Sequence, residues 1–269
     1  MIIDFHTHAF NEKIVEKALA SLTANSGLMP HGAGTIQSLV EIQRSHGVDL
    51  SVVCNIATKP SQHKVVNDFA ASIQKQTPFA IGFGSVHPLA EDALDELDRI
   101  QSLGLKGVKL HPDYQHFFVD DPRCIPVYEK ISRLGLVTVF HTGLDLGADG
   151  TFENTPERMS HILPVFTTPV VAAHLGGGLD ADNVLRYLVG QPHVYLDTAH
   201  CYGRMRHPSA IAIVKAHGPS HILYGSDMPW SGPKEEQFFV RSLGLSPEEE
   251  AKVLGGNAEK LLGLIDKAG

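Results

Sequence analysis

Two histidines separated by one residue, His6 and His8, follow a short apolar run at the start of the chain. Side chains on a strand alternate between its faces, so positions i and i+2 point the same way and both rings can approach one ion. Neutral imidazole is the commonest metal ligand in proteins. An isolated His-x-His pair is weak evidence, so its meaning depends on whether other strands bring similar residues to the same place.

Residues of the same kind recur at the ends of other apolar runs along the chain. They are His6, His8, His87, His111, His141, His174 and Asp227. Three histidines and one carboxylate suit Zn²⁺ or another borderline divalent ion, with one position left open for water. A divalent ion lowers the pKa of such a water, and Asp227 is the natural acceptor of its proton. The pattern therefore predicts a metal site built from several of these residues.

The apolar runs have the length and composition of buried strands. Eight strands are predicted, at residues 1–5, 51–57, 79–86, 107–111, 137–141, 170–174, 194–197 and 221–227. Apolar residues at helical spacing predict helices at 11–22, 35–47, 61–76, 90–103, 125–134, from 156 onward, and at 182–189, 209–217, 234–243 and 247–264. Residues 113–123 are predicted to form a long loop.

This alternation of strands and helices implies parallel strands joined by helical crossovers. Eight units in 269 residues match an α/β fold of the (β/α)8 TIM-barrel type, as one domain over residues 1–269. The alternative is an open doubly wound sheet, which usually has a Gly-rich turn after its first strand, where this chain has His-Thr-His. In a barrel the carboxyl ends of all strands form one rim, so the barrel predicts that the histidines and Asp227 meet there.

Other polar residues near the strands are expected to have simpler roles. Asp197 is followed by Thr-Ala-His, which favours a structural hydrogen-bonding role deeper in the strand. His87 is either a rim residue or part of a strand stop with Pro88. Histidines on helices or at strand starts are expected to be surface or packing residues: His31, His46, His63, His161, His193, His217 and His221.

The motifs, taken in order, resemble those of the amidohydrolase superfamily over essentially the whole chain. They are closest to the amidohydrolase-related branch that includes aminocarboxymuconate-semialdehyde decarboxylase and related metal-dependent TIM-barrel hydrolases. The segments that carry the resemblance are His6-Thr7-His8, Lys109-Leu110-His111-Pro112, His141-Thr142-Gly143, Ala173-His174-Leu175-Gly176-Gly177, Tyr224-Gly225-Ser226-Asp227-Met228-Pro229 and Gly255-Gly256-Asn257-Ala258.

The resemblance implies a role for each matching residue. It implies that the metal ligands are His6, His8, His141 and Asp227, with Zn²⁺ the usual ion. His174 would then face the substrate as an acid, a base or a polarising group, or would bind a second ion. Asp227 would act both as a ligand and as the catalytic proton acceptor.

Lys109 is the ambiguous residue of the set. In superfamily members with two ions, the lysine at this place is carbamylated and bridges them; an unmodified Lys109 would instead bind a substrate carboxylate. One ion per chain is favoured, and two ions with carbamylated Lys109 are the alternative. His111 is expected to support the ligands or contact the substrate, and with Lys109 and His174 it belongs to the residues that a second ion would use.

Loop residues near the rim are expected to set specificity. Arg204 and Arg206 follow the seventh strand and suit a carboxylate or phosphate, although a solvated loop pair is equally compatible with the sequence. Four aromatic residues either wall an apolar pocket or pack the loops: Tyr114, Phe117, Phe118 and Trp230.

The composition limits the partners. A formal net charge of −8 without a basic run argues against nucleic acid or an anionic membrane as the main partner. The three cysteines have no CxxC spacing and the N-terminus is not signal-like, so we expect a reduced, cytoplasmic setting. No apolar run approaches the length of a membrane helix. A small-molecule substrate is expected, and the sequence leaves a homo-oligomer open.

The sequence thus predicts a metal-dependent hydrolase in which an activated water attacks an amide, lactone or ester carbonyl. The alternative on the same frame is a non-oxidative decarboxylase or hydratase of a carboxylated unsaturated or aromatic acid. A non-catalytic binding or scaffold protein is the third hypothesis, and the complete set of candidate ligands argues against it.

Overall fold

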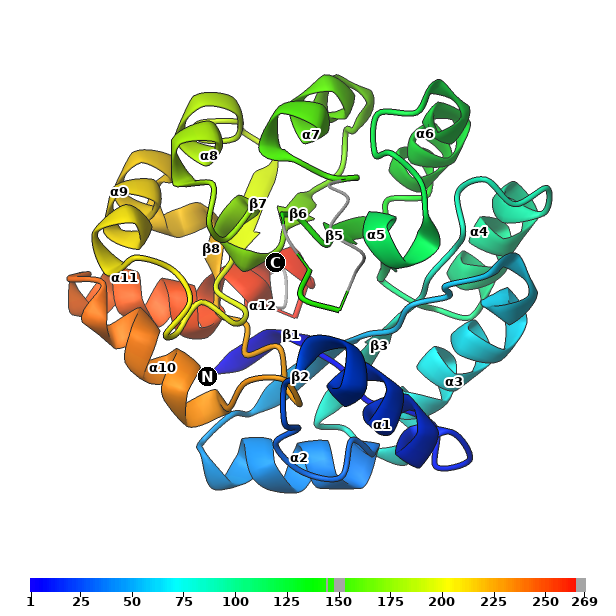
Figure 1. Cartoon of the computed structure of the whole chain (residues 1–269), viewed down its shortest axis with the longest axis horizontal. Helices are drawn as coiled ribbons and strands as arrows, with labels where there is room; N and C mark the ends of the chain where they lie inside the picture. Colours follow the sequence, from blue (N-terminus) through cyan, green and yellow to red (C-terminus); the bar gives the residue numbers. More distant parts are fainter. Residues whose placement is uncertain (144, 148–152, 265–269) are drawn as a thin grey trace, which may run out of the picture.

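The strands of this chain form a ring enclosed by helices, as the computed structural model shows (Figure 1). The structure describes residues 1–143, 145–147 and 153–264. The strands are β1 Ile3–Thr7, β2 Leu50–Cys54, β3 Ala80–Phe83, β4 Gly107–Leu110, β5 Val137–Phe140, β6 Val170–Ala172, β7 Val194–Asp197 and β8 Ile222–Leu223.

All adjacent strands pair in parallel, and the ring is closed. The strands run in chain order in two sheets, β1-β2-β3 and β4-β5-β6-β7-β8. Single parallel bridges join the sheets on both sides, Gly84 to Val108 and Thr7 to Met228. The TIM barrel is confirmed, and the open doubly wound sheet was wrong because β1 and the β8 segment are joined.

Most of the helices surround the strands on the outside, and α12 lies across one end of the ring (Figure 1). They are α1 Val15–Ser26, α2 Ile36–Ser45, α3 His63–Gln76, α4 Ala93–Ser102, α5 Pro112–Gln115, α6 Ile125–Arg133, α7 Pro156–Ile162, α8 Ala181–Tyr187, α9 His207–His217, α10 Pro233–Ser242, α11 Pro247–Ala251 and α12 Asn257–Leu261. Thr35 and Thr155 cap α2 and α7 by accepting hydrogen bonds from backbone N–H groups three residues on.

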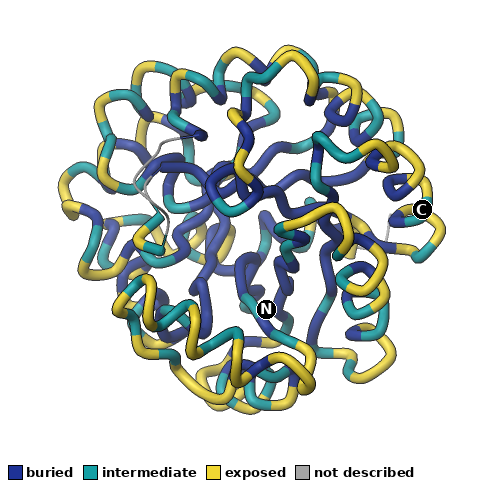
Figure 2. Tube along the Cα trace, turned by 45° about the vertical axis from the view of Figure 1, so that its right-hand side comes forward, coloured by how far each residue is buried: buried dark blue, intermediate teal, exposed yellow. Residues whose placement is uncertain are grey.

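Burial follows the ring, with the strands buried on both faces and the outer helix surfaces exposed (Figure 2). An apolar cluster joins residues of six strands to Ala258 and Leu262 at the C-terminal end of the described chain. The Lys106 ammonium, just before β4, donates to the Leu262 carbonyl. This segment therefore closes the barrel at the amino ends of the strands, and the opposite end is left open.

Three segments differ from the prediction. The helix predicted over 247–264 is divided by a π-helical turn, Lys252–Gly256, in which Gly255 lies so close to the Met1 backbone that a Cβ would collide with it. The loop predicted over 113–123 begins with the short helix α5, which has a proline at its first position. The last strand is only two residues long, Ile222–Leu223, and the segment that follows it is held to β1 by the bonds from Phe5 N–H to the Tyr224 carbonyl and from Asp227 N–H to the His6 carbonyl.

Two global features are also visible in the described ranges. No helix there is both long enough and apolar enough to cross a bilayer. The thiols of Cys54, Cys124 and Cys201 are unpaired and buried.

Candidate metal centre

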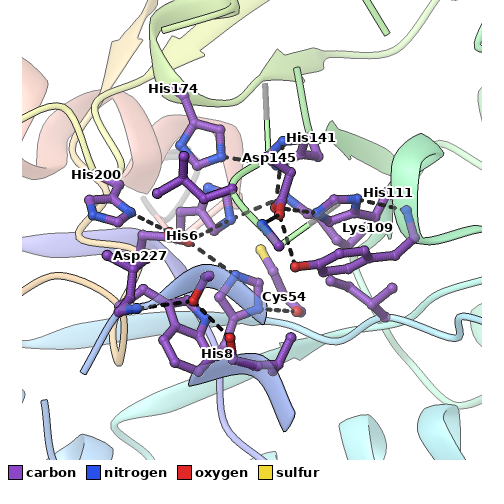
Figure 3. Close-up of a pocket in the computed structure, with 18 of the residues that line it drawn as sticks. His6, His8, Cys54, Lys109, His111, His141, Asp145, His174, His200 and Asp227 are labelled. Carbon is purple, nitrogen blue, oxygen red and sulfur yellow. Dashed lines mark hydrogen bonds and ion pairs between the residues drawn. The ribbon is translucent and has the colours of Figure 1, made fainter. Parts of the chain in front are cut away.

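A cavity of about 450 Å³ opens at the carboxyl ends of the strands. The predicted rim residues that line it are His6, His8, Lys109, His111, His141, His174 and Asp227. Figure 3 shows these side chains converging from different strands. Six of the seven residues predicted at the strand ends therefore line the cavity, together with the inward-facing Lys109, whereas His87 is not among the described residues that line it.

His6, His8 and Asp227 form one compact group of potential ligands. One donor atom from each lies within 4.8 Å of the other two. Asp227 Oδ1 is 3.1 Å from His8 Nε2 and 3.5 Å from His6 Nε2. Two imidazoles and a carboxylate are the ligand types of open catalytic zinc sites.

The hydrogen bonds of the two rings determine which nitrogen faces this group. His6 Nδ1 donates to the Asp197 carboxylate at 2.8 Å, and His8 Nδ1 donates to the Cys54 carbonyl at 2.9 Å. Each ring in its neutral form therefore presents an unprotonated Nε2 toward Asp227. The Nε2 atoms of His6 and His8 and the Asp227 oxygen are all hydrogen-bond acceptors, so they cannot hydrogen-bond to one another. A cation between them would be coordinated by all three. The site therefore fits a divalent metal ion, and Asp197 has the supporting role that such a ligand requires.

The second carboxylate oxygen of Asp227 does not face His6 and His8. Its Oδ2 lies 3.3 Å from Nδ1 of His200. Burial alone would raise the pKa of Asp227, but the contacts with His200 and His8 and the nearby His6 outweigh it and hold the pKa well below its ordinary value. Asp227 is therefore an ionised carboxylate with one oxygen toward the ligand group and one toward an imidazole.

The backbone at this end of the barrel is strained. Asp227, His174 and His200 all have positive φ, between 53° and 67°, and all three line the cavity. Such conformations are unfavourable for residues with a side chain and cluster at functional sites. Gly225 is needed for a different reason, because a Cβ there would lie 2.9 Å from Cβ of His6. The β8 segment therefore approaches β1 closely and brings Asp227 to the histidines.

Lys109 lies at the base of the cavity and is only 1% exposed. Its Nζ is 3.1 Å from His6 Nε2, the nitrogen that faces Asp227. Burial, followed by the charge of Lys109, lowers the pKa of His6 to about 4, so the His6 ring is neutral. Lys109 thus contacts the ligand group directly through His6, and a bound ion would compete with it for the same lone pair.

A second group of polar side chains lies beside the first. His111 Nε2 is 3.3 Å from Asp145 Oδ2, while the other Asp145 oxygen accepts from the Tyr114 hydroxyl and the Gly147 backbone N–H. The ring of His111 is stacked between the rings of Tyr114 and His141, at 4.1 and 4.0 Å. The stack fixes the plane of the His141 ring.

The structure places His141 in this second group and not with His6, His8 and Asp227. His174 Nδ1 donates to the Ala199 carbonyl, so its Nε2 accepts from His141 Nδ1 at 3.1 Å. His141 Nε2 is therefore unprotonated; it is buried, 3.8 Å from Asp145 Oδ2, and has no hydrogen-bond partner within the described ranges. His141 is therefore separated from the other three predicted ligands, His6, His8 and Asp227. Its ring is held in place by the hydrogen bond to His174 and by the stack with His111.

His111, His141 and Asp145 are also close enough to hold an ion. The two imidazole planes, however, are inclined by only 9° and stacked. Lone pairs lie in the ring planes, so two stacked rings cannot direct them at one point. An ion shared by both rings would require one of them to turn, and we regard the His6 group as the better preformed site.

The loop residues divide between the cavity and the outer surface. Arg204 is half-buried and lines the cavity, whereas Arg206 is exposed at the start of α9 and is not among the described lining residues. The two arginines therefore do not act as the pair that the sequence suggested. Tyr114 and Trp230 wall the cavity.

The other two aromatic residues of the predicted wall do not reach the cavity. Phe117 is buried in the core, and the ring of the exposed Phe118 lies under the Arg158 guanidinium. The histidines expected to be packing or surface residues also lie outside the described cavity wall. Two of them, His63 and His217, are buried and hydrogen-bonded to the backbone.

Several cavity residues were not singled out from the sequence, among them Cys54, Asp145 and His200. Asp145 and His200 follow strand ends by several residues, so strand alternation gave no signal for them. The position of Cys54 as the last residue of β2 could have identified it. Burial raises the pKa of the Cys54 thiol to about 12, which favours the neutral thiol over the thiolate.

Comparison with known proteins agrees with this arrangement. Residues 3–264 match the Amidohydrolase family, and the chain belongs to that family. It is an enzyme of the amidohydrolase superfamily, as its motifs predicted.

Solved structures share the fold over almost their whole length. An uncharacterised TIM-barrel protein from Bordetella bronchiseptica is 23% identical, with a TM-score of 0.76 and coverage of 97% of this chain and 98% of that one. A 2,6-dihydroxybenzoate decarboxylase in complex with 2,6-dihydroxybenzoate is 17% identical, with a TM-score of 0.73 and 98% coverage of both chains. A dihydroxybenzoic acid decarboxylase from Polaromonas, with bound manganese and 2-nitroresorcinol, is 16% identical, with a TM-score of 0.73 and coverage of 98% and 97%.

Proposed function

We propose that this chain is a metal-dependent hydrolase that uses an activated water to attack the carbonyl carbon of an amide, lactone or ester. The observation that carries this proposal is the placement of Asp227, whose Oδ1 faces His6 and His8 while its Oδ2 faces His200. Hydrolysis needs a proton acceptor beside the activated water, and an ionised carboxylate in this position meets that need.

His6, His8 and Asp227 are the residues that would hold the ion. A divalent ion bound there would polarise the carbonyl and lower the pKa of the attacking water. Zn²⁺ is our first choice because two nitrogens and one oxygen suit it, and Mn²⁺ is the alternative, as in the manganese-containing decarboxylase of the same fold. His141 would become a fourth ligand only if its ring left the bond to His174.

The neighbouring residues supply the proton transfers. Asp227 takes the proton of the water, and His200, hydrogen-bonded to its outer oxygen, stabilises the carboxylate in position. His174 is our candidate for polarising or protonating the substrate, since the Ala199 carbonyl fixes its ring and its Nε2 lies beside His141.

Non-oxidative decarboxylation is the second candidate. The positive charges of Lys109 and Arg204 in the cavity wall suit a substrate carboxylate, and several proteins with this fold are decarboxylases of aromatic acids. Decarboxylation requires a group that delivers a proton to carbon. We rank hydrolysis first because the Asp227 carboxylate, in contact with His6, His8 and His200, is placed to accept a proton beside the ligand group.

The test is a panel of amides, lactones, esters and carboxylated aromatic acids, with product formation and carbon dioxide release measured together. Hydrolysis predicts products without carbon dioxide, and Asp227→Asn should lower kcat by about 10²–10⁴-fold. Asp120→Asn is the matched control, because Asp120 pairs with His161 on the outer surface. Carbon dioxide release from wild type, or full hydrolytic activity in Asp227→Asn, would refute the proposal.

A further inference from the structure

The outer part of the cavity is apolar, in contrast to the histidine-rich floor. Of the eleven large apolar side chains that are exposed in the described ranges, four line this one cavity. They are Ile14 at 54% exposure, Val65 at 66%, Leu146 at 41% and Leu179 at 71%. They come from the α1 start, α3 and the loops after β5 and β6, and we call these four residues the apolar rim.

The cavity wall below the apolar rim also carries large apolar side chains. It includes Phe69 of α3, Met205 and Trp230, each of which lines the cavity. The acids Asp145 and Asp227 and the base Lys109 lie together at the histidine-rich end (Figure 3). In the described part of the wall, Arg204 is the remaining residue with a full charge.

A contiguous exposed apolar surface marks a place where a ligand or a partner binds. Here the four rim residues line the same cavity as His6 and Asp227, and its volume of about 450 Å³ is that of a small-molecule site. A flat partner surface could cover the rim but could not fill the space beneath it. The cavity therefore favours a small apolar ligand over a protein partner.

We infer that the substrate carries an apolar group of several carbons, a chain or a ring, which extends from the reacting carbonyl along this wall to the apolar rim. The inference that the substrate has a reacting carbonyl depends on the proposed function, whereas the apolar subsite is inferred independently of it. The rim residues would then set specificity through the area of hydrocarbon that they remove from water. Short or highly charged substrates would leave the rim exposed and bind weakly.

The chain has a built-in reporter for this subsite. Trp230 is its one tryptophan, and it lines the cavity. Straight-chain 2-alkanones of six to ten carbons are suitable probes, because they carry a carbonyl group that cannot be hydrolysed. Titration followed by Trp230 fluorescence should give a Kd that falls about fourfold for each added methylene, until the chain passes the rim.

Two rim variants, Val65→Asp and Leu179→Asp, should weaken binding of the ten-carbon ketone by at least about tenfold and leave the six-carbon ketone nearly unaffected. Leu94→Asp is the matched control, since Leu94 is 40% exposed on α4 and is not among the described cavity residues. Equal affinity for short and long ketones in wild type would overturn the inference, as would an equal loss in the Leu94→Asp control. If the chain-length dependence holds while no carbonyl compound is hydrolysed, the proposed function fails and the apolar subsite stands.

Discussion

Asp197 should control metal affinity without contacting the ion. Its Oδ2 accepts from His6 Nδ1 at 2.8 Å, and its Oδ1 accepts from the backbone N–H groups of His174 and Ala199 at 3.0 and 3.1 Å. In Asp197→Asn, the side-chain oxygen can keep the two backbone bonds. The amide nitrogen then faces His6 Nδ1, so that two donors oppose each other.

The His6 ring can avoid this conflict only by moving its proton to Nε2. That tautomer removes the lone pair that faces Asp227 and Lys109, and with it the ability to bind an ion. Loss of the outer partner of a metal-binding histidine typically lowers metal affinity by about 10–100-fold, or about 1.4–2.7 kcal/mol. We expect a loss in this range, with the fold retained because the backbone bonds remain.

The assay is calorimetric titration of metal-free protein with Zn²⁺, accompanied by thermal unfolding to establish that the variant is folded. Asp120→Asn is the control, since its carboxylate also accepts from a histidine Nδ1, at 3.1 Å from His161, but outside the cavity. A folded Asp197→Asn variant that binds zinc as tightly as wild type would refute the tautomer argument.

Three further predictions concern the surroundings of the site. Burial raises the pKa of Glu236 to about 8 from 4.5, so between these pH values the folded state holds a proton that the unfolded state has released, and stability falls as the pH rises. Glu236→Gln should flatten this part of the pH dependence in urea unfolding at pH 6 and pH 8.5; an unchanged slope would show that Glu236 is ionised when folded. Lys109→Arg, which cannot be carbamylated, should bind the same single ion as wild type by elemental analysis. A second ion in wild type that disappears in Lys109→Arg would instead support a bridged pair. Gly225→Ala should push His6 away from Asp227 and weaken zinc binding by about tenfold or more, and unchanged binding would contradict the close approach of the β8 segment to β1.

Strand alternation was sufficient to predict the barrel and most of its rim. A buried parallel strand is a nearly continuous apolar run, and a histidine or aspartate at its end is easily recognised. His6, His111, His141 and His174 could therefore be placed around one cavity without any long-range information. Asp227 could be placed there too, although its strand is much shorter than predicted.

Ring orientation and loop position could not be predicted in the same way. The separation of His141 from the His6 group depends on one hydrogen bond to His174 and on the stack with His111, which are contacts between different strands. Asp145 and His200 lie on loops, where no periodicity fixes the direction of a side chain. The strand pattern therefore predicts which residues meet but not which atoms face one another.

The central claim is that His6, His8 and Asp227 hold a divalent ion. The most direct measurement is the zinc bound per chain, and its Kd, in metal-free wild type and His8→Ala, with His161→Ala as the control for loss of a histidine outside the cavity. The geometry predicts one tightly bound ion in wild type and in His161→Ala, and binding weakened by about 100-fold or more in His8→Ala. Equal zinc affinity in His8→Ala and wild type would contradict it.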